Sequence, residues 1–196
     1  MAGKLIFYFG TVNSSKTLNL LAIGHNYDTC GWHVCTVKPA LDTRSELIET
    51  RVHVPPRKAD IVISERESFF DYKDIINDAD VILIDECQFL SSEQVNELRS
   101  IATSRDIDIL CFGLRTDFNT NLFPAAKRLF ELADESTEVK TICSICGKHA
   151  SFNAKVKQIS NETCNEQYLG VNCKNNISPS WDAFEQRCWK HFDYRE

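Results

Sequence analysis

Gly10, Lys16 and Thr17 have the spacing of a phosphate-binding loop. In the pattern G-x-x-x-x-G-K-[ST], main-chain N–H groups and a helix N-terminus bind phosphate oxygens, the lysine neutralises their charge and the hydroxyl holds Mg²⁺. An apolar run precedes Gly10, a helical pattern follows Lys16, and Ser15 occupies the position of the second glycine. The segment predicts a nucleotide-phosphate site, although taken alone it also fits an ordinary strand-to-helix turn.

A pair of carboxylates, Asp85 and Glu86, follows the aliphatic run VILI. In open α/β folds, ligands bind at the carboxyl ends of the parallel strands. An aspartate in this position can reach Mg²⁺, and the glutamate beside it is free to act as a base. A solvated acidic turn is the alternative, but a phosphate-loop candidate on another strand of the same sheet favours the catalytic interpretation.

Two pairs of metal-ligand residues lie near the C-terminus: Cys143 with Cys146, and Cys188 with His191. Two residues separate the members of each pair, which is the spacing typical of a tetrahedral structural zinc site. Cys164 and Cys173 are competing ligands without a close partner, and unrelated cysteines in hairpins are the alternative interpretation. We expect the zinc to stabilise a lobe that has little apolar material of its own.

Alternating apolar and helical segments predict an α/β fold up to about residue 140. Continuous apolar runs indicate strands that are buried on both faces of a mostly parallel sheet, with helices on both faces. The expected strands are residues 4–9, 34–39, 60–64, 81–85 and 108–113, and the expected helices are residues 16–27, 91–104 and 122–134. A cysteine-bearing hairpin over residues 141–156 and a polar stretch over residues 160–180 follow. We therefore expect two domains, residues 1–139 and 140–196.

Composition limits the class of protein. The net charge of -6 argues against binding along a nucleic-acid backbone but remains compatible with a small anionic substrate. No apolar run reaches the roughly 18–20 residues of a membrane helix, and the N-terminus lacks the pattern of a signal peptide, so we expect a cytoplasmic protein without a membrane partner. Four further cysteines are expected to be small buried residues: Cys30, Cys35, Cys87 and Cys111.

Six segments together resemble the type II thymidine kinases over essentially the whole chain. They read GTVNSSKT, KPALDTR, DECQFL, FGLRTDFNTNLF, KTICSICGKHAS and CWKHF. The resemblance implies a P-loop NTPase-like kinase domain with a small zinc-binding lasso domain, and ATP, Mg²⁺ and structural Zn²⁺ as cofactors. It also implies transfer of the ATP γ-phosphate to the 5′-hydroxyl of thymidine, or of deoxyuridine, by a homotetramer.

The resemblance also implies roles for individual residues. Glu86 would be the catalytic base, and Asp85 would assist Mg²⁺. The residues expected to bind ATP are Gly10, Thr11, Val12, Asn13, Ser14, Ser15, Lys16, Thr17, Asp85, Glu86, Cys87 and Gln88. The residues expected to bind the nucleoside are Asp42, Arg44, Phe89, Leu114, Phe118, Asn153 and Phe184. The zinc ligands would be Cys143, Cys146, Cys188 and His191.

Several positions differ from the family pattern. Val12 replaces a methionine, Ser15 a glycine and Phe184 a tyrosine, while Asn153 stands where the pocket usually meets the thymine methyl group. A relative that binds nucleotide with altered or lost kinase activity is therefore the alternative to an active kinase. A P-loop ATPase that acts on nucleic acid is a third possibility, which the acidic balance disfavours.

Overall fold

The computed structural model describes residues 3–42, 47–52, 54–156 and 183–192. Within these residues the largest sheet has six strands, all parallel, in the order β5-β2-β6-β7-β1-β8. Its strands are β1 (Leu5–Gly10), β2 (Val34–Pro39), β5 (Ile61–Ile63), β6 (Val81–Ile84), β7 (Asp108–Leu114) and β8 (Glu135–Glu138). The mostly parallel sheet predicted from the apolar runs is confirmed.

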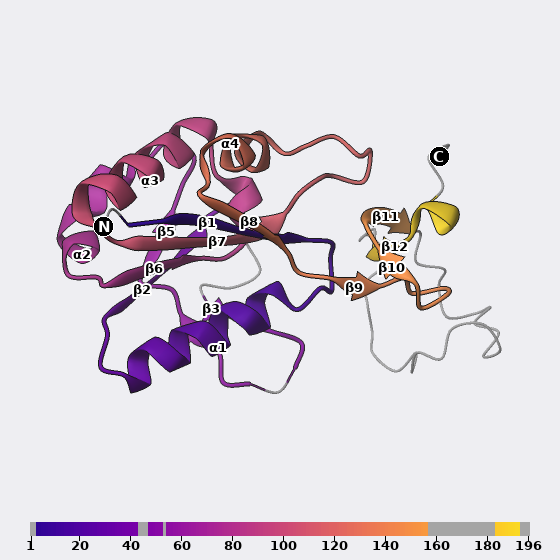
Figure 1. Ribbon diagram of the computed structural model, residues 1–196, viewed down its shortest axis with the longest axis horizontal. Coiled ribbons are helices and arrows are strands. Elements are labelled where there is room, and N and C mark those ends of the chain that lie inside the picture. The colour runs from indigo at the N-terminus through magenta and orange to yellow at the C-terminus, as the bar shows by residue number, and fades with distance from the viewer. Residues whose placement is uncertain (1–2, 43–46, 53, 157–182, 193–196) are drawn as a thin grey trace.

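Helices cover both faces of the sheet, as expected. Figure 1 shows α1 on one face and α2, α3 and α4 on the other. They span Lys16–Thr29 (α1), Lys73–Asn77 (α2), Ser92–Arg105 (α3) and Pro124–Leu132 (α4). Side chains alternate along β6, so that Ile82 and Ile84 join the core beneath α3 while Val81 and Leu83 join the core beneath α1. The strand is therefore buried on both faces, which explains its unbroken aliphatic sequence.

Helix α3 begins at the capping box that the sequence predicted. The Ser91 hydroxyl accepts a hydrogen bond from the Gln94 main-chain N–H, and the Gln94 side chain accepts one from the Ser91 N–H. Gln94 is buried, and its Nε2 also donates to the carbonyls of Ser64 and Glu67. One amide thus caps α3 and anchors the segment that follows β5.

Replacing this amide should destabilise the fold. We expect Gln94→Ala to lower the free energy of unfolding by about 2–3 kcal/mol, because the carbonyls of Ser64 and Glu67 lose their donor and α3 loses half of its cap. Denaturant unfolding measures the loss. The matched control is Glu93→Gln at the exposed neighbouring position, which should change the unfolding free energy by less than about 0.5 kcal/mol.

Several short elements were missed by the sequence analysis. They are β8, α2, the hairpin of β3 (Leu47–Ile48) and β4 (Arg57–Lys58), and the 3-10 helix η1 (Phe69–Tyr72). Strand β8 reads Glu-Ser-Thr-Glu and pairs with β1 at the edge of the sheet. Its side chains are largely exposed, so it has no apolar pattern that could have predicted it.

A second group of strands lies beyond the carboxyl ends of the main sheet (Figure 1). Its elements are β9 (Thr141–Ile142), β10 (His149–Ala150), β11 (Phe152–Val156), β12 (Ala183–Arg187) and the 3-10 helix η4 (Trp189–His191). Strand β9 pairs with β10 and β11 pairs with β12, each antiparallel. We call these elements the metal lobe; residues 160–180 lie outside the described residues.

The four cysteines expected in the core separate into two groups. Cys35, Cys87 and Cys111 are buried, as predicted, but Cys30 is exposed and that prediction is wrong. Cys30 caps the C-terminal end of α1, where the chain turns at the surface, so the neighbouring apolar pattern does not extend to it.

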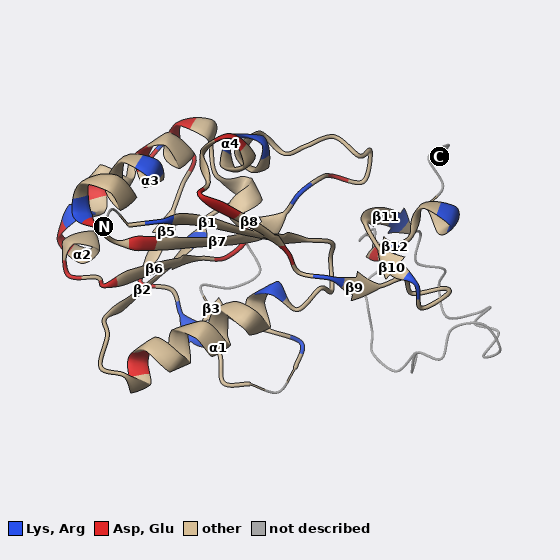
Figure 2. Cartoon of the chain, in the orientation of Figure 1, with Lys and Arg blue, Asp and Glu red and all other residues tan. Residues whose placement is uncertain are grey.

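Charged residues of both signs are interspersed along the same elements, as Figure 2 shows for α3. None of the described helices combines the length and the apolar character that crossing a membrane requires.

Candidate active site and metal centre

The predicted phosphate loop joins the end of β1 to the start of α1. Gly10 is the last residue of β1, and α1 begins at Lys16. A Cβ atom at position 10 would lie 2.5 Å from the Ser14 Oγ and 2.6 Å from the Val139 carbonyl oxygen. The close approach of these two segments therefore requires a glycine at position 10.

Two residues of the loop adopt the left-handed conformation, Asn13 with φ 58° and Ser15 with φ 63°. This conformation costs a residue other than glycine about 1–2 kcal/mol. Ser15 thus replaces the glycine of the pattern without changing the backbone conformation expected there. Asparagine tolerates the conformation better than most residues, which suits position 13.

Lys16 folds back over the loop. Its ammonium group donates to the Thr11 carbonyl at 2.7 Å and to the Ser14 hydroxyl at 3.3 Å, and the residue is 8% exposed. Burial lowers the pKa of Lys16, while the charges of Glu86 and Asp85 oppose that shift. A buried cation held inside an amide-lined loop is suited to an anion such as phosphate.

Asp85 connects the loop to the carboxyl end of β6. Its carboxylate accepts a hydrogen bond from the Thr17 hydroxyl, with oxygen–oxygen distances of 3.1 and 3.2 Å. Burial raises the pKa of Asp85 to about 7, the neighbouring charge of Glu86 adds to the rise, and the Thr17 hydroxyl opposes it. A buried carboxylate beside a hydroxyl is an oxygen donor set that fits Mg²⁺.

Glu86 stands directly after Asp85 in the left-handed conformation, with φ 49°. It precedes the 3-10 helix η2 (Cys87–Phe89). The Gln88 Nε2 donates to the Glu86 carboxylate at 2.7 Å, and the Gln88 Oε1 accepts from the Leu114 N–H at 2.9 Å. Gln88 is 2% exposed, so a buried amide anchored at the end of β7 orients the Glu86 carboxylate.

Cys87 behaves differently from its neighbours. Its side chain is fully buried in the same core cluster as Cys111, and burial raises the pKa of its thiol well above the usual range. Because the thiol is fully buried, any contact between Cys87 and a nucleotide would involve the main chain.

A cavity of about 240 Å³ lies beside these groups. The residues that line it include Thr17, Asp85, Glu86 and the predicted Asp42. It also contains Lys38, which the sequence analysis missed and which forms a 3.0 Å ion pair with Asp42. Both side chains of this pair are at least nine-tenths buried. A lysine near the carboxyl end of a buried strand was the signal that could have identified it.

The residues expected to surround the nucleoside are partly brought together. Phe118 and Phe184 lie with ring centroids 6.0 Å apart, and the Lys155 ammonium group stands 5.5 Å above Phe118. Phe89 packs edge-on against Phe123, and Leu114 ends β7. Arg44 lies outside the described residues.

Asn153, also expected to contact the nucleoside, is buried and hydrogen-bonded to main-chain groups. It is 4% exposed, its Oδ1 accepts from the Val12 N–H at 2.8 Å, and its Nδ2 donates to the Thr116 carbonyl at 2.8 Å. Both polar ends of the side chain are thus engaged by main chain. A direct contact between Asn153 and the base stays a prediction.

A larger, open depression of about 560 Å³ lies on α3 and α4. Its two arginines, Arg99 and Arg128, form ion pairs with Asp134 and Glu131. It contains none of the predicted site residues, whereas the smaller cavity beside the phosphate loop is lined by Thr17, Asp42, Asp85 and Glu86.

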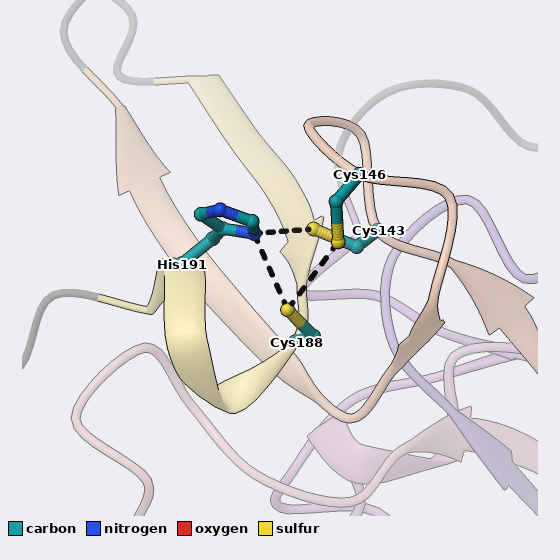
Figure 3. Close-up of side chains that lie close together, drawn as sticks. All are labelled: Cys143, Cys146, Cys188 and His191. Atoms are coloured by element: carbon teal, nitrogen blue, oxygen red, sulfur yellow. Dashed lines mark hydrogen bonds between the residues drawn. The ribbon is translucent and has the colours of Figure 1, made fainter.

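The four predicted zinc ligands converge in the metal lobe (Figure 3). The ligand atoms of Cys143, Cys146, Cys188 and His191 all lie within 4.8 Å of one another. Tetrahedral zinc with Zn–S bonds of about 2.3 Å would hold two sulfur atoms about 3.8 Å apart. The Cys146 and Cys188 sulfur atoms are 3.7 Å apart, and the His191 Nδ1 is 3.4 Å from the Cys188 Sγ and 3.7 Å from the Cys143 Sγ. The geometry fits a tetrahedral ion.

The environment of Cys143 favours the thiolate that zinc requires. Burial opposes its ionisation, but main-chain N–H groups of Cys188, Ile145 and Cys146 outweigh burial and lower the pKa of Cys143 to about 6. Cys164 and Cys173, the competing ligands, lie outside the described residues.

Removing one sulfur should disrupt metal binding. We expect Cys146→Ser to lose most of its bound zinc and to melt at a lower temperature, because the free energy of metal binding contributes to folding. Elemental analysis of purified protein and thermal melting measure the two effects. Cys30→Ser, at an exposed cysteine outside the cluster, is the control and should keep its full zinc content. Full zinc content in Cys146→Ser would show that Cys146 is not a ligand.

The loop after β1 and the carboxylates after β6 are typical of a P-loop nucleotide-binding α/β protein, and the Cys/His cluster is compatible with a zinc ion. A sequence profile of the thymidine kinase family matches residues 3–177. Thymidine kinase from Streptococcus agalactiae is 38% identical over 150 residues, which cover 76% of this chain and 79% of that protein. Thymidine kinase from Enterobacteria phage T4 is 35% identical over 79% of this chain and 81% of its own, and that from Encephalitozoon cuniculi is 39% identical over 78% and 72%. The chain belongs to the thymidine kinase family.

Proposed function

We propose that the protein is an ATP-dependent thymidine kinase that transfers the γ-phosphate of ATP to the 5′-hydroxyl of thymidine, or of deoxyuridine, to give the nucleoside monophosphate. The observation that carries the proposal is the contact between Thr17 and Asp85, which joins the phosphate loop to the acidic pair. Membership of the family favours an active kinase over a relative that binds nucleotide without turnover.

Phosphoryl transfer depends mainly on positioning and on the stabilisation of negative charge. The main chain of residues 10–17 would bind the ATP phosphates, and Lys16 would neutralise part of their charge. Thr17 and Asp85 would hold Mg²⁺, which when bound screens the charge of the β- and γ-phosphates. The hydrogen bond to the Asp85 carboxylate also fixes the position of the Thr17 hydroxyl.

Glu86 is the proposed general base. Its carboxylate would accept the proton of the attacking 5′-hydroxyl, while the hydrogen bond from Gln88 holds it in place. Asp42 and Arg44 would lie near the transferred phosphoryl group, and the Lys38–Asp42 pair supports that position for Asp42. Phe89, Leu114, Phe118 and Phe184 would provide apolar contacts to the base.

The role of Glu86 is tested with a variant of equal size. We expect Glu86→Gln to lower kcat by roughly 10²–10⁴-fold with little change in KM, because the amide keeps an acceptor for Gln88 but cannot take up the proton. The assay measures monophosphate formed from Mg·ATP and a panel of deoxynucleosides. The control is Glu65→Gln at an exposed position, which should keep full activity.

The assay tests the role of Glu86 separately from the kinase assignment. Unchanged turnover in Glu86→Gln would remove Glu86 from the role of base while leaving the kinase assignment intact. A wild-type protein that phosphorylates no nucleoside would overturn the kinase assignment itself.

We further propose that residues 1–139 form the kinase domain and residues 140–196 a zinc-binding lasso domain, and that the protein acts in the cytoplasm as a homotetramer. The tetramer rests on the family resemblance. We expect light scattering on the purified protein to give a mass of about four chains of 22.4 kDa. The mass of a single chain at micromolar concentration would contradict it.

A further inference from the structure

Side chains of the metal lobe hold the phosphate loop through three hydrogen bonds. The Asn153 Oδ1 accepts from the Val12 N–H at 2.8 Å, and the Gln186 Oε1 accepts from the Asn13 Nδ2 at 2.9 Å. The Thr141 hydroxyl donates to the Asn13 carbonyl at 3.3 Å. All three partners in the lobe lie more than a hundred residues from the loop along the chain.

Asn153 is the central member of this set. Its buried amide joins β11 to the Val12 N–H on one side and to the Thr116 carbonyl, just after β7, on the other. An asparagine can do this because its side chain carries both an acceptor and a donor. A shorter hydroxyl side chain could not span the same gap, and an aspartate would lack the donor for Thr116.

The phosphate loop contains strained residues that hydrogen bonds from the metal lobe can hold in place. Asn13 and Ser15 both adopt the left-handed conformation, which persists when the surrounding structure over-determines it. Two of the three hydrogen bonds from the lobe engage Asn13 itself. The bond from Asn153 fixes the preceding residue, so the lobe determines the path by which the chain enters the strained part of the loop.

The same residues are tied closely to the zinc ligands. Thr141 stands two residues before Cys143, and Gln186 stands two residues before Cys188. Asn153 lies directly opposite Gln186 in the β11–β12 pair, and the Ser144 N–H donates to the Gln186 carbonyl at 3.2 Å. The four-ligand cluster therefore clamps the strands that present Asn153, Gln186 and Thr141.

We propose that Asn153 is a positioning residue for ATP binding: together with Gln186 and Thr141 it braces the phosphate loop from the metal lobe. The inference deepens the proposed function and rests on ATP binding at this loop. If the brace exists, the zinc affects nucleotide affinity, although the zinc ligands lie outside the phosphate site. It also differs from the role near the thymine methyl group that the family resemblance implies for Asn153.

The experiment uses zinc-loaded full-length protein and titrates a non-hydrolysable ATP analogue with Mg²⁺ by calorimetry. We expect Asn153→Ala to weaken binding of the analogue about tenfold and Gln186→Ala to weaken it about threefold, with zinc content and the KM for thymidine unchanged. Asn153→Asp keeps the acceptor for Val12, but it turns an oxygen toward the Thr116 carbonyl and adds a negative charge beside the loop, so its affinity should fall at least as far as that of Asn153→Ala. Asn26→Ala, at an exposed position of α1, is the control and should bind like the wild type.

A rescue variant separates positioning from general destabilisation. Glycine adopts the left-handed conformation without steric cost, so adding Ser15→Gly to Asn153→Ala should restore part of the lost affinity. Because Ser15→Gly relieves the same strain in the wild type, the single variant is measured alongside, and the substitution should raise analogue affinity more in Asn153→Ala than in the wild type. Equal loss of affinity with and without Ser15→Gly would count against the brace.

Hydrogen exchange supplies a readout that does not depend on nucleotide. We expect the main-chain amides of residues 10–17 to exchange faster in Asn153→Ala and Gln186→Ala than in the wild type.

Unchanged analogue affinity and exchange in Asn153→Asp and Gln186→Ala would overturn the proposal even if Asn153→Ala failed to fold. A raised KM for thymidine with unchanged analogue affinity would instead assign Asn153 to the base. A wild-type protein that binds no analogue would refute the proposed function, while the exchange rates would still decide whether the brace exists.

Discussion

The hydrogen bond from the Thr17 hydroxyl to the Asp85 carboxylate joins two segments that lie far apart in the sequence. Thr17 belongs to the first turn of α1, Asp85 follows β6, and β7 lies between β1 and β6 in the sheet. Because these strands are parallel, their carboxyl ends meet at one edge and the segments that follow them converge. The loop, the hydroxyl and the acidic pair therefore share one small region in which Lys16 lies within range of both carboxylate charges.

Backbone strain is a feature of the same region. Three of the five described non-glycine residues with positive φ lie here, namely Asn13, Ser15 and Glu86. The close contacts of Gly10 with Ser14 and Val139 restrict the loop, and the buried amide of Gln88 restrains the Glu86 carboxylate. The fold thus holds the groups that phosphoryl transfer requires in place before substrates bind, so that less reorganisation is needed on binding.

The metal lobe has a very small apolar core among the described residues, made of Cys143, Ala150 and Cys188. Such a core contributes little to stability, so a bound ion would supply much of what holds these strands together. The lobe lies against the phosphate loop rather than apart from it. A rigid metal lobe would also restrain the phosphate loop that it contacts, and that loop contains two strained residues.

The spacing of residues close together in the sequence was sufficient to predict the parallel sheet and several local motifs. The aliphatic runs predicted the parallel sheet because strands buried on both faces need apolar side chains at every position. The capping box at Ser91, the loop pattern at Gly10–Thr17 and the paired zinc ligands each depend on a few residues close together in the chain. Polar β8, the exposed Cys30 and the ion pair of Lys38 were missed, because their environments depend on which distant segments pack beside them. Asn153 shows the difference most clearly: its sequence position suggested a substrate contact, but its hydrogen-bond partners are set by the docking of the metal lobe against the phosphate loop.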